Sequence, residues 1–215
     1  MADQAAIDKI VQSLHWLGHD TFRLDRPKGP IYFDPYEMTG GEPASIILAS
    51  HDHFDHCVAE EVQKILGPDT VVITEPDCAA KLPGQVRSMK PGDEITVGDV
   101  VIKAVPAYNT NKDFHPKDKN WLGFVVTVDG VSIYHAGDTD FIPEMEGLEP
   151  DIALLPVSGT YVMTAAEAVE AAKAIRPKLA IPMHYGAIVG SEEDAKAFAQ
   201  GLEGVIPVRI LPKEE

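Results

Sequence analysis

Short apolar runs, separated by turn residues, recur along the whole chain. Runs of this length that are bounded by Gly, Pro, Asn or Asp predict strands. The pair Asp129-Gly130 between two such runs is a strong signal for a hairpin. We expect strands at 14–24, 30–33, 45–50, 70–74, 100–106, 121–128, 131–134, 152–156, 179–182 and 205–211.

Helical spacing of apolar residues occurs in a few segments between these runs. The apolar residues of 58–66 recur every three to four positions, and Gly67-Pro68 ends the segment. Thr164 followed by Glu167 forms a capping box at the start of another helix. We expect helices over 58–66, 76–82, 164–176 and 192–202, and a short helix or turn over 5–14. Strands and helices therefore alternate in the first half, and the middle is mostly strand.

The length and the charge limit what this domain does. A chain of 215 residues fits one domain over 1–215 with a substantial core. Its 34 acidic residues outnumber 18 basic ones, which gives a net charge of −16. A surface this acidic repels phosphate backbones, so general binding of nucleic acid is disfavoured and a small-molecule substrate is expected.

Targeting signals and disulfides are not expected. The N-terminal segment lacks the basic and apolar pattern of a signal peptide, and no apolar run is long enough to span a membrane. Cys57 and Cys78 indicate no disulfide framework, and a small buried thiol is expected at Cys57. These features predict a cytoplasmic protein with no membrane association. The oligomeric state stays open, with a homo-oligomer as one alternative.

The densest candidate chemistry follows the apolar run at 45–50. His51, His53, Asp55 and His56 place four metal-binding side chains within six residues. If the chain stays extended past the strand, His51 and His53 project to the same side, because side chains alternate with period two. A turn near Phe54 would present Asp55 and His56 from a second direction. Imidazole and carboxylate ligands suit zinc, iron, manganese or nickel.

Two further metal-binding side chains also follow expected strands. Asp138 lies in a Gly-Asp-Thr turn after the run at 131–134, and His184 follows the run at 179–182. Ligand sites in layered α/β folds gather where strands end, so these positions indicate one shared site. A polar loop over 109–120 contains His115, and a loop of that length in a compact domain is usually functional or mobile.

Together these motifs resemble those of the metallo-β-lactamase-fold hydrolases, and most closely the branch that includes ascorbate-6-phosphate lactonase. The resemblance covers nearly the whole chain and is carried by Leu17-Gly18-His19, Asp34-Pro35, His51-Asp52-His53-Phe54-Asp55-His56, Ala136-Gly137-Asp138-Thr139, Ser158-Gly159-Thr160-Tyr161 and Met183-His184-Tyr185-Gly186.

The resemblance implies a four-layer αββα sandwich with two divalent ions (zinc, manganese or nickel, with iron as a further option) at one edge of the sheets. It implies that His51 and His53 bind the first ion. The second ion would be bound by Asp55, His56 and His184, and Asp138 would bridge the two.

One position departs from the family pattern. The family usually supplies a further histidine for the first ion where this chain has Asn109. His115 could replace it, Asn109 could bind through its carbonyl oxygen, or water could fill the position. We favour His115. If neither side chain serves, the first ion would be weakly held and the protein could work with one.

Other side chains near these motifs are candidates for the substrate pocket. Tyr108, Asn109 and Tyr161 could flank it, although packing in the core is an equal alternative for the tyrosines. Lys112, with Lys117 and Lys119, could guide an anionic substrate, or the three could form a solvated loop. His19 is expected to line the site without binding metal, and His135 to belong to the core.

The first hypothesis for function is metal-assisted hydrolysis. Bound metals lower the pKa of water toward about 7 and supply hydroxide, and Asp55 would orient it while Asp138 bridges the ions. A phosphodiester or a phosphorylated lactone ranks above a β-lactam as the substrate. One alternative is a mononuclear iron oxidoreductase on the same fold, which iron content and oxygen consumption would support. Another is a non-catalytic metal-binding module, which predicts bound metal without turnover.

Overall fold

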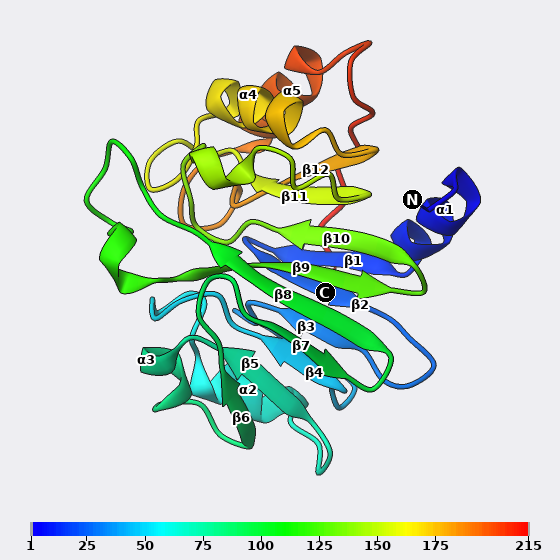
Figure 1. Cartoon of the computed structure of the whole chain (residues 1–215), viewed down its shortest axis with the longest axis vertical. Coiled ribbons are helices and arrows are strands. Elements are labelled where there is room, and N and C mark those ends of the chain that lie inside the picture. Colours follow the sequence, from blue (N-terminus) through cyan, green and yellow to red (C-terminus); the bar gives the residue numbers. More distant parts are fainter. Residues whose placement is uncertain (1, 215) are drawn as a thin grey trace.

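Two six-stranded sheets face each other through a common core in the computed structural model, which describes residues 2–214 (Figure 1). The first sheet follows the order of the chain: β1 (Leu14–Gly18), β2 (Thr21–Leu24), β3 (Ile31–Phe33), β4 (Ile46–Leu48), β5 (Val71–Thr74) and β6 (Gln85–Ser88). The second sheet runs in the order β12 (Leu179–Met183), β11 (Ile152–Pro156), β10 (Val131–His135), β9 (Leu122–Val128), β8 (Val100–Pro106) and β7 (Glu94–Val97).

Helices cover the outer face of each sheet (Figure 1). Helices α4 (Ala165–Ile175) and α5 (Glu192–Gly201) lie on the second sheet and contact β11 and β12. Helices α2 (Ala59–Ile65) and α3 (Pro76–Ala79) cover the first sheet, and α1 (Gln4–Gln12) packs at one end against β1 and β10. Short 3₁₀ turns are η1 (Lys117–Lys119) and η2 (Pro143–Met145). The predicted αββα sandwich is confirmed.

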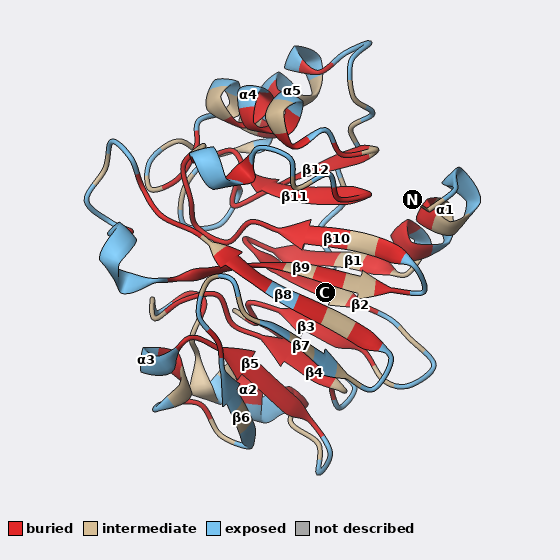
Figure 2. Cartoon of the chain, in the orientation of Figure 1, coloured by how far each residue is buried: buried red, intermediate tan, exposed pale blue. Residues whose placement is uncertain are grey.

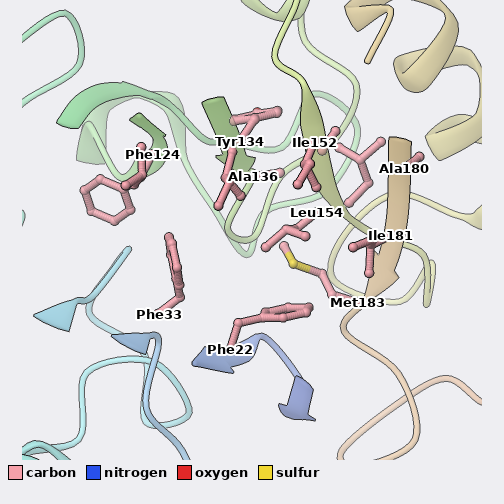
Figure 3. Packing of buried hydrophobic residues seen from close by; sticks show 14 of the residues in the cluster. Phe22, Phe33, Phe124, Tyr134, Ala136, Ile152, Leu154, Ala180, Ile181 and Met183 are labelled. Atoms are coloured by element: carbon pink, nitrogen blue, oxygen red, sulfur yellow. The ribbon is translucent and has the colours of Figure 1, made fainter. Parts of the chain in front are cut away.

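The core explains why the strands are apolar on both faces. In β4, Ile46 and Leu48 face the opposite sheet, whereas Ile47 between them packs with the residues under α2 and α3. Between the sheets, Phe22 and Phe33 meet Leu154 and Met183 from the other side (Figure 3). Figure 2 shows the same arrangement as mostly buried strands, with exposed residues concentrated in helices and loops. Burying each such side chain contributes about 1.5–3 kcal/mol.

Strand direction decides where polar side chains gather. β1, β3 and β4 run parallel, as do β8, β10, β11 and β12 in the other sheet. The carboxyl ends of parallel strands meet at one edge of a sheet. Backbone hydrogen bonds join these two edges: the amide of Leu122 donates to Ser50, and that of His184 donates to His19. The segments after these strands therefore meet in one place.

Two expectations about the backbone were wrong. The run at 14–24 is a hairpin, because His19 and Asp20 form a tight turn between β1 and β2. The run at 205–211 forms no strand; it makes only an isolated bridge between Val208 and Ala180. Pro207 within it has no amide hydrogen to donate to a ladder.

The two cysteines, expected as separate thiols, are joined. Cys57 and Cys78 form a disulfide, and their Cα atoms are 6.0 Å apart. They are 21 residues apart in the sequence, and the packing of the loop before α2 against α3 brings them together. Cys57 is also only half-buried, contrary to the expectation of a buried thiol. No helix in residues 2–214 is both long enough and apolar enough to cross a membrane.

Candidate metal centre

The loop after β4 carries the histidine cluster and is shaped by one buried carboxylate. The amide of Ser50 donates to Oδ1 of Asp34, over 2.7 Å, which fixes the chain where β4 ends. The amides of His56 and Cys57 both donate to the carbonyl of His53 and close a turn. This turn gives the change of direction that the sequence predicted near Phe54.

Three histidines form the first of two groups at this edge. Potential ligand atoms of His51, His53 and His115 all lie within 4.8 Å of one another. Nε2 of His51 is 3.0 Å from Nδ1 of His53. The indole of Trp121 packs against all three imidazoles, with ring centroids 4.7–5.5 Å apart. We call His51, His53 and His115 the three-histidine group.

Asn109 positions His115. Oδ1 of Asn109 lies 3.0 Å from the backbone nitrogen of His115 and 3.0 Å from its Nδ1. The side-chain nitrogen Nδ2 of Asn109 donates to the carboxylate of Asp140 and to the carbonyl of Tyr161, so both ends of the side-chain amide are held. With Nδ1 engaged, Nε2 of His115 faces Oδ2 of Asp138, 3.2 Å away. The structure therefore places His115 beside His51 and His53, with Asn109 behind it.

The second group mixes imidazoles and carboxylates. Potential ligand atoms of Asp20, His56, Asp138 and His184 lie within 4.8 Å of one another, and so do those of His19, His56 and His184. All of these side chains are buried. We call His19, Asp20, His56, Asp138 and His184 the mixed group.

Asp138 lies between the two groups. Its Oδ2 is 3.2 Å from Nε2 of His115 and 3.2 Å from Nε2 of His184. Its Oδ1 is 3.5 Å from Nε2 of His56. The two oxygens thus reach a histidine of the three-histidine group and two of the mixed group. This is the position that a bridging carboxylate requires.

A polar atom behind each of three histidines holds the ring in orientation. Oδ2 of Asp34 is 2.8 Å from Nδ1 of His56. The hydroxyl oxygens of Ser50 and Ser158 are 2.9 Å from Nδ1 of His51 and 2.8 Å from Nδ1 of His184. Such outer contacts fix which nitrogen faces a metal and raise its affinity.

Unusual backbone conformations aim three of these side chains. His19, Asp34 and His184 have φ values of 51°, 40° and 59°. Residues other than glycine adopt this left-handed region rarely, and such strain concentrates at functional sites. The hydrogen bond from the amide of His184 to the carbonyl of His19, over 3.0 Å, ties the two turns together.

The histidines of the two groups differ in charge. Burial lowers the pKa of His51 well below its usual value, and burial lowers that of His53 too. Burial also acts on His56 and His184, but the acidic side chains around them together more than offset it: Asp138 and Asp34 for His56, and Asp138 and Asp20 for His184. The pKa of His56 is raised well above its usual value, and that of His184 is raised to about 9. Without a metal, His56 and His184 hold their protons, whereas His51 and His53 are neutral.

The carboxyl groups of the mixed group also differ. Burial by itself raises a carboxyl pKa, yet His184 and His56 hold the pKa of Asp138 well below its usual range. Burial raises the pKa of Asp20 well above its usual range, with a further contribution from Asp138 nearby. Asp138 is thus the carboxylate that charges the site.

The residues present fit metal ions. Nε2 of His56, Nε2 of His115 and Oδ1 of Asp138 are buried and make no hydrogen bond within residues 2–214. Buried polar atoms without partners are costly, and converging nitrogen and oxygen atoms of this kind are the ligands of zinc, manganese and iron. The two groups, with Asp138 between them, therefore form a candidate metal centre.

A small pocket opens onto this centre. It encloses about 230 Å³ and is lined by His53, Phe54, Asp55, Phe114, His115, Asp138, Tyr161 and Ile188. Three of these are the apolar side chains Phe54, Phe114 and Ile188, which are 71%, 48% and 38% exposed. Large apolar side chains at the mouth of a polar pocket are typical of binding sites.

Of the four side chains that we predicted to contact substrate, the structure brings Tyr161 to the pocket. Tyr108 is buried and its hydroxyl donates to Glu144, and Asn109 lies behind His115. Lys112 forms an ion pair with Asp140, over 2.7 Å, and does not line the pocket.

Lys117 and Lys119, the other lysines considered as a guide for an anion, also have acidic partners. Nζ of Lys117 lies 2.9 Å from Glu144, and Nζ of Lys119 lies 3.7 Å from Asp77. The lysines of this loop are therefore paired with carboxylates.

Several residues of the site were not predicted as such. Asp34 and Ser158 enter the sequence analysis only within motifs of the family resemblance, and the sequence assigns no role to Asp20, Ser50 or Trp121. A position beside a histidine is their shared feature, and a single sequence does not display it. His135 lies in the core, where its Nε2 donates to the carbonyl of Asp20 and its ring stacks on Phe33.

Comparisons with known proteins place this geometry. Residues 13–184 match the family model of the β-lactamase superfamily domain. A UPF0173 metal-dependent hydrolase of Methanoculleus marisnigri is 35% identical over 92% of this chain and 91% of its own. The solved structure of a protein from Parabacteroides distasonis is 33% identical with a TM-score of 0.84, covering 94% and 93% of the two chains. The metallo hydrolase Igni18 of Ignicoccus hospitalis is 23% identical with a TM-score of 0.76, covering 94% and 95%, and shares the fold.

Proposed function

The chain belongs to the metallo-β-lactamase superfamily and, within it, to the UPF0173 family of metal-dependent hydrolases. From this premise we propose that it hydrolyses a small ester or lactone with two divalent ions. The observation that carries the proposal is the position of Asp138 between the two groups of ligands. A centre for one ion would not need a carboxylate that reaches both groups of ligands.

Each ion would have its own set of ligands. His51, His53 and His115 would hold the first ion, and His56 and His184 the second, with Asp138 shared. When bound, such ions lower the pKa of water toward about 7 and polarise the oxygen of the bond to be cleaved. Chemistry of this kind needs no serine or cysteine nucleophile.

Asp55 is the residue best placed to handle the proton of the attacking water. It lines the pocket, and its Oδ2 is 3.7 Å from Nε2 of His56. Burial by itself raises its pKa, but the hydrogen bond from Nε2 of His19, over 3.1 Å, lowers that pKa below the usual value. A carboxylate kept ionised beside the metals can orient a water and accept its proton, and His19 holds it in place. Asp55 also remains a candidate ligand of the second ion.

The pocket favours a substrate with an apolar part. Phe54, Phe114 and Ile188 offer apolar contact at the mouth, and the ring of Tyr161 packs edge-on against Phe114 with centroids 4.7 Å apart. Among residues 2–214, no lysine or arginine lines the pocket, so an anionic substrate would depend on the ions alone for attraction. The likeness to ascorbate-6-phosphate lactonases stays a prediction, and we rank an ester or lactone above a phosphodiester.

The test is hydrolysis by protein that has been stripped of metal and reloaded separately with zinc, manganese, nickel or iron. The panel comprises an aryl ester, an aliphatic lactone, a phosphorylated lactone, an aryl phosphodiester and a chromogenic β-lactam. Asp138→Ala is the inactive variant, and Asp118→Ala, an exposed carboxylate in the loop that carries His115, is its matched control.

We expect turnover of the ester or the lactone that survives in Asp118→Ala and is lost in Asp138→Ala. Turnover that is unchanged in Asp138→Ala would contradict the proposed site. Bound metal with no turnover of any compound would favour the binding module instead, and oxygen consumption by the iron form would favour the oxidoreductase.

A further inference from the structure

Asp20 is a buried carboxylate for which the fold provides no hydrogen bond. It follows His19 in the turn between β1 and β2 and is 1% exposed. Within residues 2–214, no group donates a hydrogen bond to either of its side-chain oxygens. A buried carboxyl group without a hydrogen-bond partner costs free energy whether or not it is ionised, so this residue requires an explanation.

Asp34, a second buried aspartate of the same site, shows what a structural carboxylate looks like. Its oxygens accept hydrogen bonds from the amide and the hydroxyl of Ser50, over 2.7 and 2.6 Å, and one lies against Nδ1 of His56. Asp34 thus has a partner for each oxygen. Asp20 is equally buried and lies 4.0 Å from the same nitrogen of His56, too far for a hydrogen bond, and has no partner.

The surroundings of Asp20 are the candidate ligands themselves. One of its oxygens lies within 4.8 Å of ligand atoms of His56, Asp138 and His184. The backbone is held in place, because its carbonyl accepts a hydrogen bond from Nε2 of His135 over 2.9 Å. Separations of this size suit atoms that share one ion, since carboxylate oxygens and imidazole nitrogens bind at about 2.0–2.2 Å.

We propose that Asp20 is a further ligand of the second ion, which it holds together with His56, Asp138 and His184. This inference rests on the proposed metal centre and adds a residue to it. The ion then has two carboxylates and two imidazoles from this group alone, with Asp55 beside them. Oxygen-rich sets of this kind suit ions that take six ligands, such as Mn²⁺ or Fe²⁺, better than a set of nitrogens alone does.

The test measures binding of Mn²⁺ and Zn²⁺ by calorimetry, and thermal unfolding of the metal-free protein. The variant is Asp20→Asn, which keeps the shape of the side chain and removes the carboxyl group that would bind the ion. The parent protein, this variant and its control all carry His115→Ala as well, so that binding of the second ion dominates the signal. The matched control is Asp151→Asn, a buried aspartate with partners in Ser132 and Lys178.

We expect Asp20→Asn to weaken Mn²⁺ binding by at least about 10-fold, as loss of a metal contact does, and to weaken Zn²⁺ binding less. We expect its metal-free form to unfold at the same temperature as the parent or higher, because Asp20 has no hydrogen-bond partner in the fold to lose. Asp151→Asn should show the reverse, with unchanged metal binding and a lower unfolding temperature.

Unchanged Mn²⁺ binding in Asp20→Asn would overturn the proposal. If the metal-free variant also unfolded at a lower temperature than the parent, the two results together would show that Asp20 shares a proton with Asp138. Equal weakening of both metals would overturn the stated preference. If the variant does not fold, a crystal structure of the Mn²⁺-loaded parent decides, because Asp20 either contacts the ion or does not. The readout is metal binding, so failure to find a hydrolysed substrate leaves this test intact.

Discussion

The three-histidine group and the mixed group lie side by side, yet they are built for different tasks. The first contains three imidazoles, and burial lowers the pKa of His51 and His53 so that they are neutral before any metal arrives. The mixed group surrounds its imidazoles with carboxylates, and His56 and His184 keep their protons as a result. A metal entering the mixed group must replace these protons, whereas His51 and His53 have none to lose.

If the site holds two ions as proposed, this difference predicts that it holds them with different strength. In the proposed centre, carboxylates would supply negative charge to the second ion, and the first ion would depend on neutral ligands and on Asp138. Changes at the shared carboxylate should therefore affect the site most, and changes behind a single histidine should affect it least.

Removing Asp138 should abolish the difference in binding strength between the two groups, because both ions lose a ligand. We expect Asp138→Ala to bind metal poorly at both positions and to lose more than about 100-fold in hydrolysis, since loss of even an outer contact costs about 10–100-fold. Metal content by mass spectrometry of dialysed protein checks this. Asp118→Ala should retain both ions, and retention of two ions by Asp138→Ala would refute the bridging role.

Raising the pH should separate the two groups. The pKa of His184 is raised to about 9, so a metal must displace its proton at neutral pH. Displacement of the His184 proton alone should raise affinity at the mixed group by up to about 100-fold between pH 7 and pH 9, and displacement of the His56 proton adds to this, whereas affinity at the three-histidine group changes little. Titrations with Mn²⁺ at several pH values measure this, and a flat profile at both positions would contradict it.

The raised pKa of His184 in the mixed group should make the metal-free protein less stable at alkaline pH. A histidine whose pKa is raised on folding stabilises the fold fully below its unfolded pKa of about 6.5. That contribution is then lost as the pH rises through about 9, the folded value for His184. The unfolding temperature in the presence of a chelator should therefore fall over this range, and a rise would be inconsistent with the assigned charges.

Removing His115 should empty one position only. We expect His115→Ala to bind one ion instead of two and to lose about 10–100-fold in hydrolysis. The matched control is His15→Ala, because both nitrogens of His15 are already paired, with Glu214 and Asp25. If His115→Ala still held two ions, Asn109 or water would have to be the ligand.

Replacing Asn109 should disturb the site least. Asn109→Ala keeps all of the proposed ligands and removes only the contact that orients His115. We expect the first ion to bind about 10-fold more weakly, as for other outer contacts, with the second ion unaffected. Competition with a chelator measures this, and complete loss of the first ion would make Asn109 a ligand.

The histidine loop was predictable because its side chains are adjacent in sequence. Period-two alternation after a strand and the ends of the later strands pointed to His51, Asp138 and His184 as neighbours. His115 came from a departure of Asn109 from the family pattern. The order of the apolar runs indicated strands and helices in alternation, and the family resemblance implied how they stack into a sandwich.

What the sequence could not supply depends on contacts between distant segments. Two features arise only when β1, β3 and β12 are brought together. They are the left-handed conformations of His19 and Asp34, and the lack of a hydrogen-bond partner for the side chain of Asp20. The pairing of the lysines with acids, which weakens the case for an anionic substrate, is equally non-local. Cys57 and Cys78 meet for the same reason.

Anomalous diffraction from crystals of the Mn²⁺-loaded protein would locate the ions themselves. Two peaks should appear, one among His51, His53 and His115, the other among Asp20, His56 and His184, with Asp138 contacting both. A single peak shared by the two groups, or ions elsewhere in the chain, would contradict a two-ion centre bridged by Asp138.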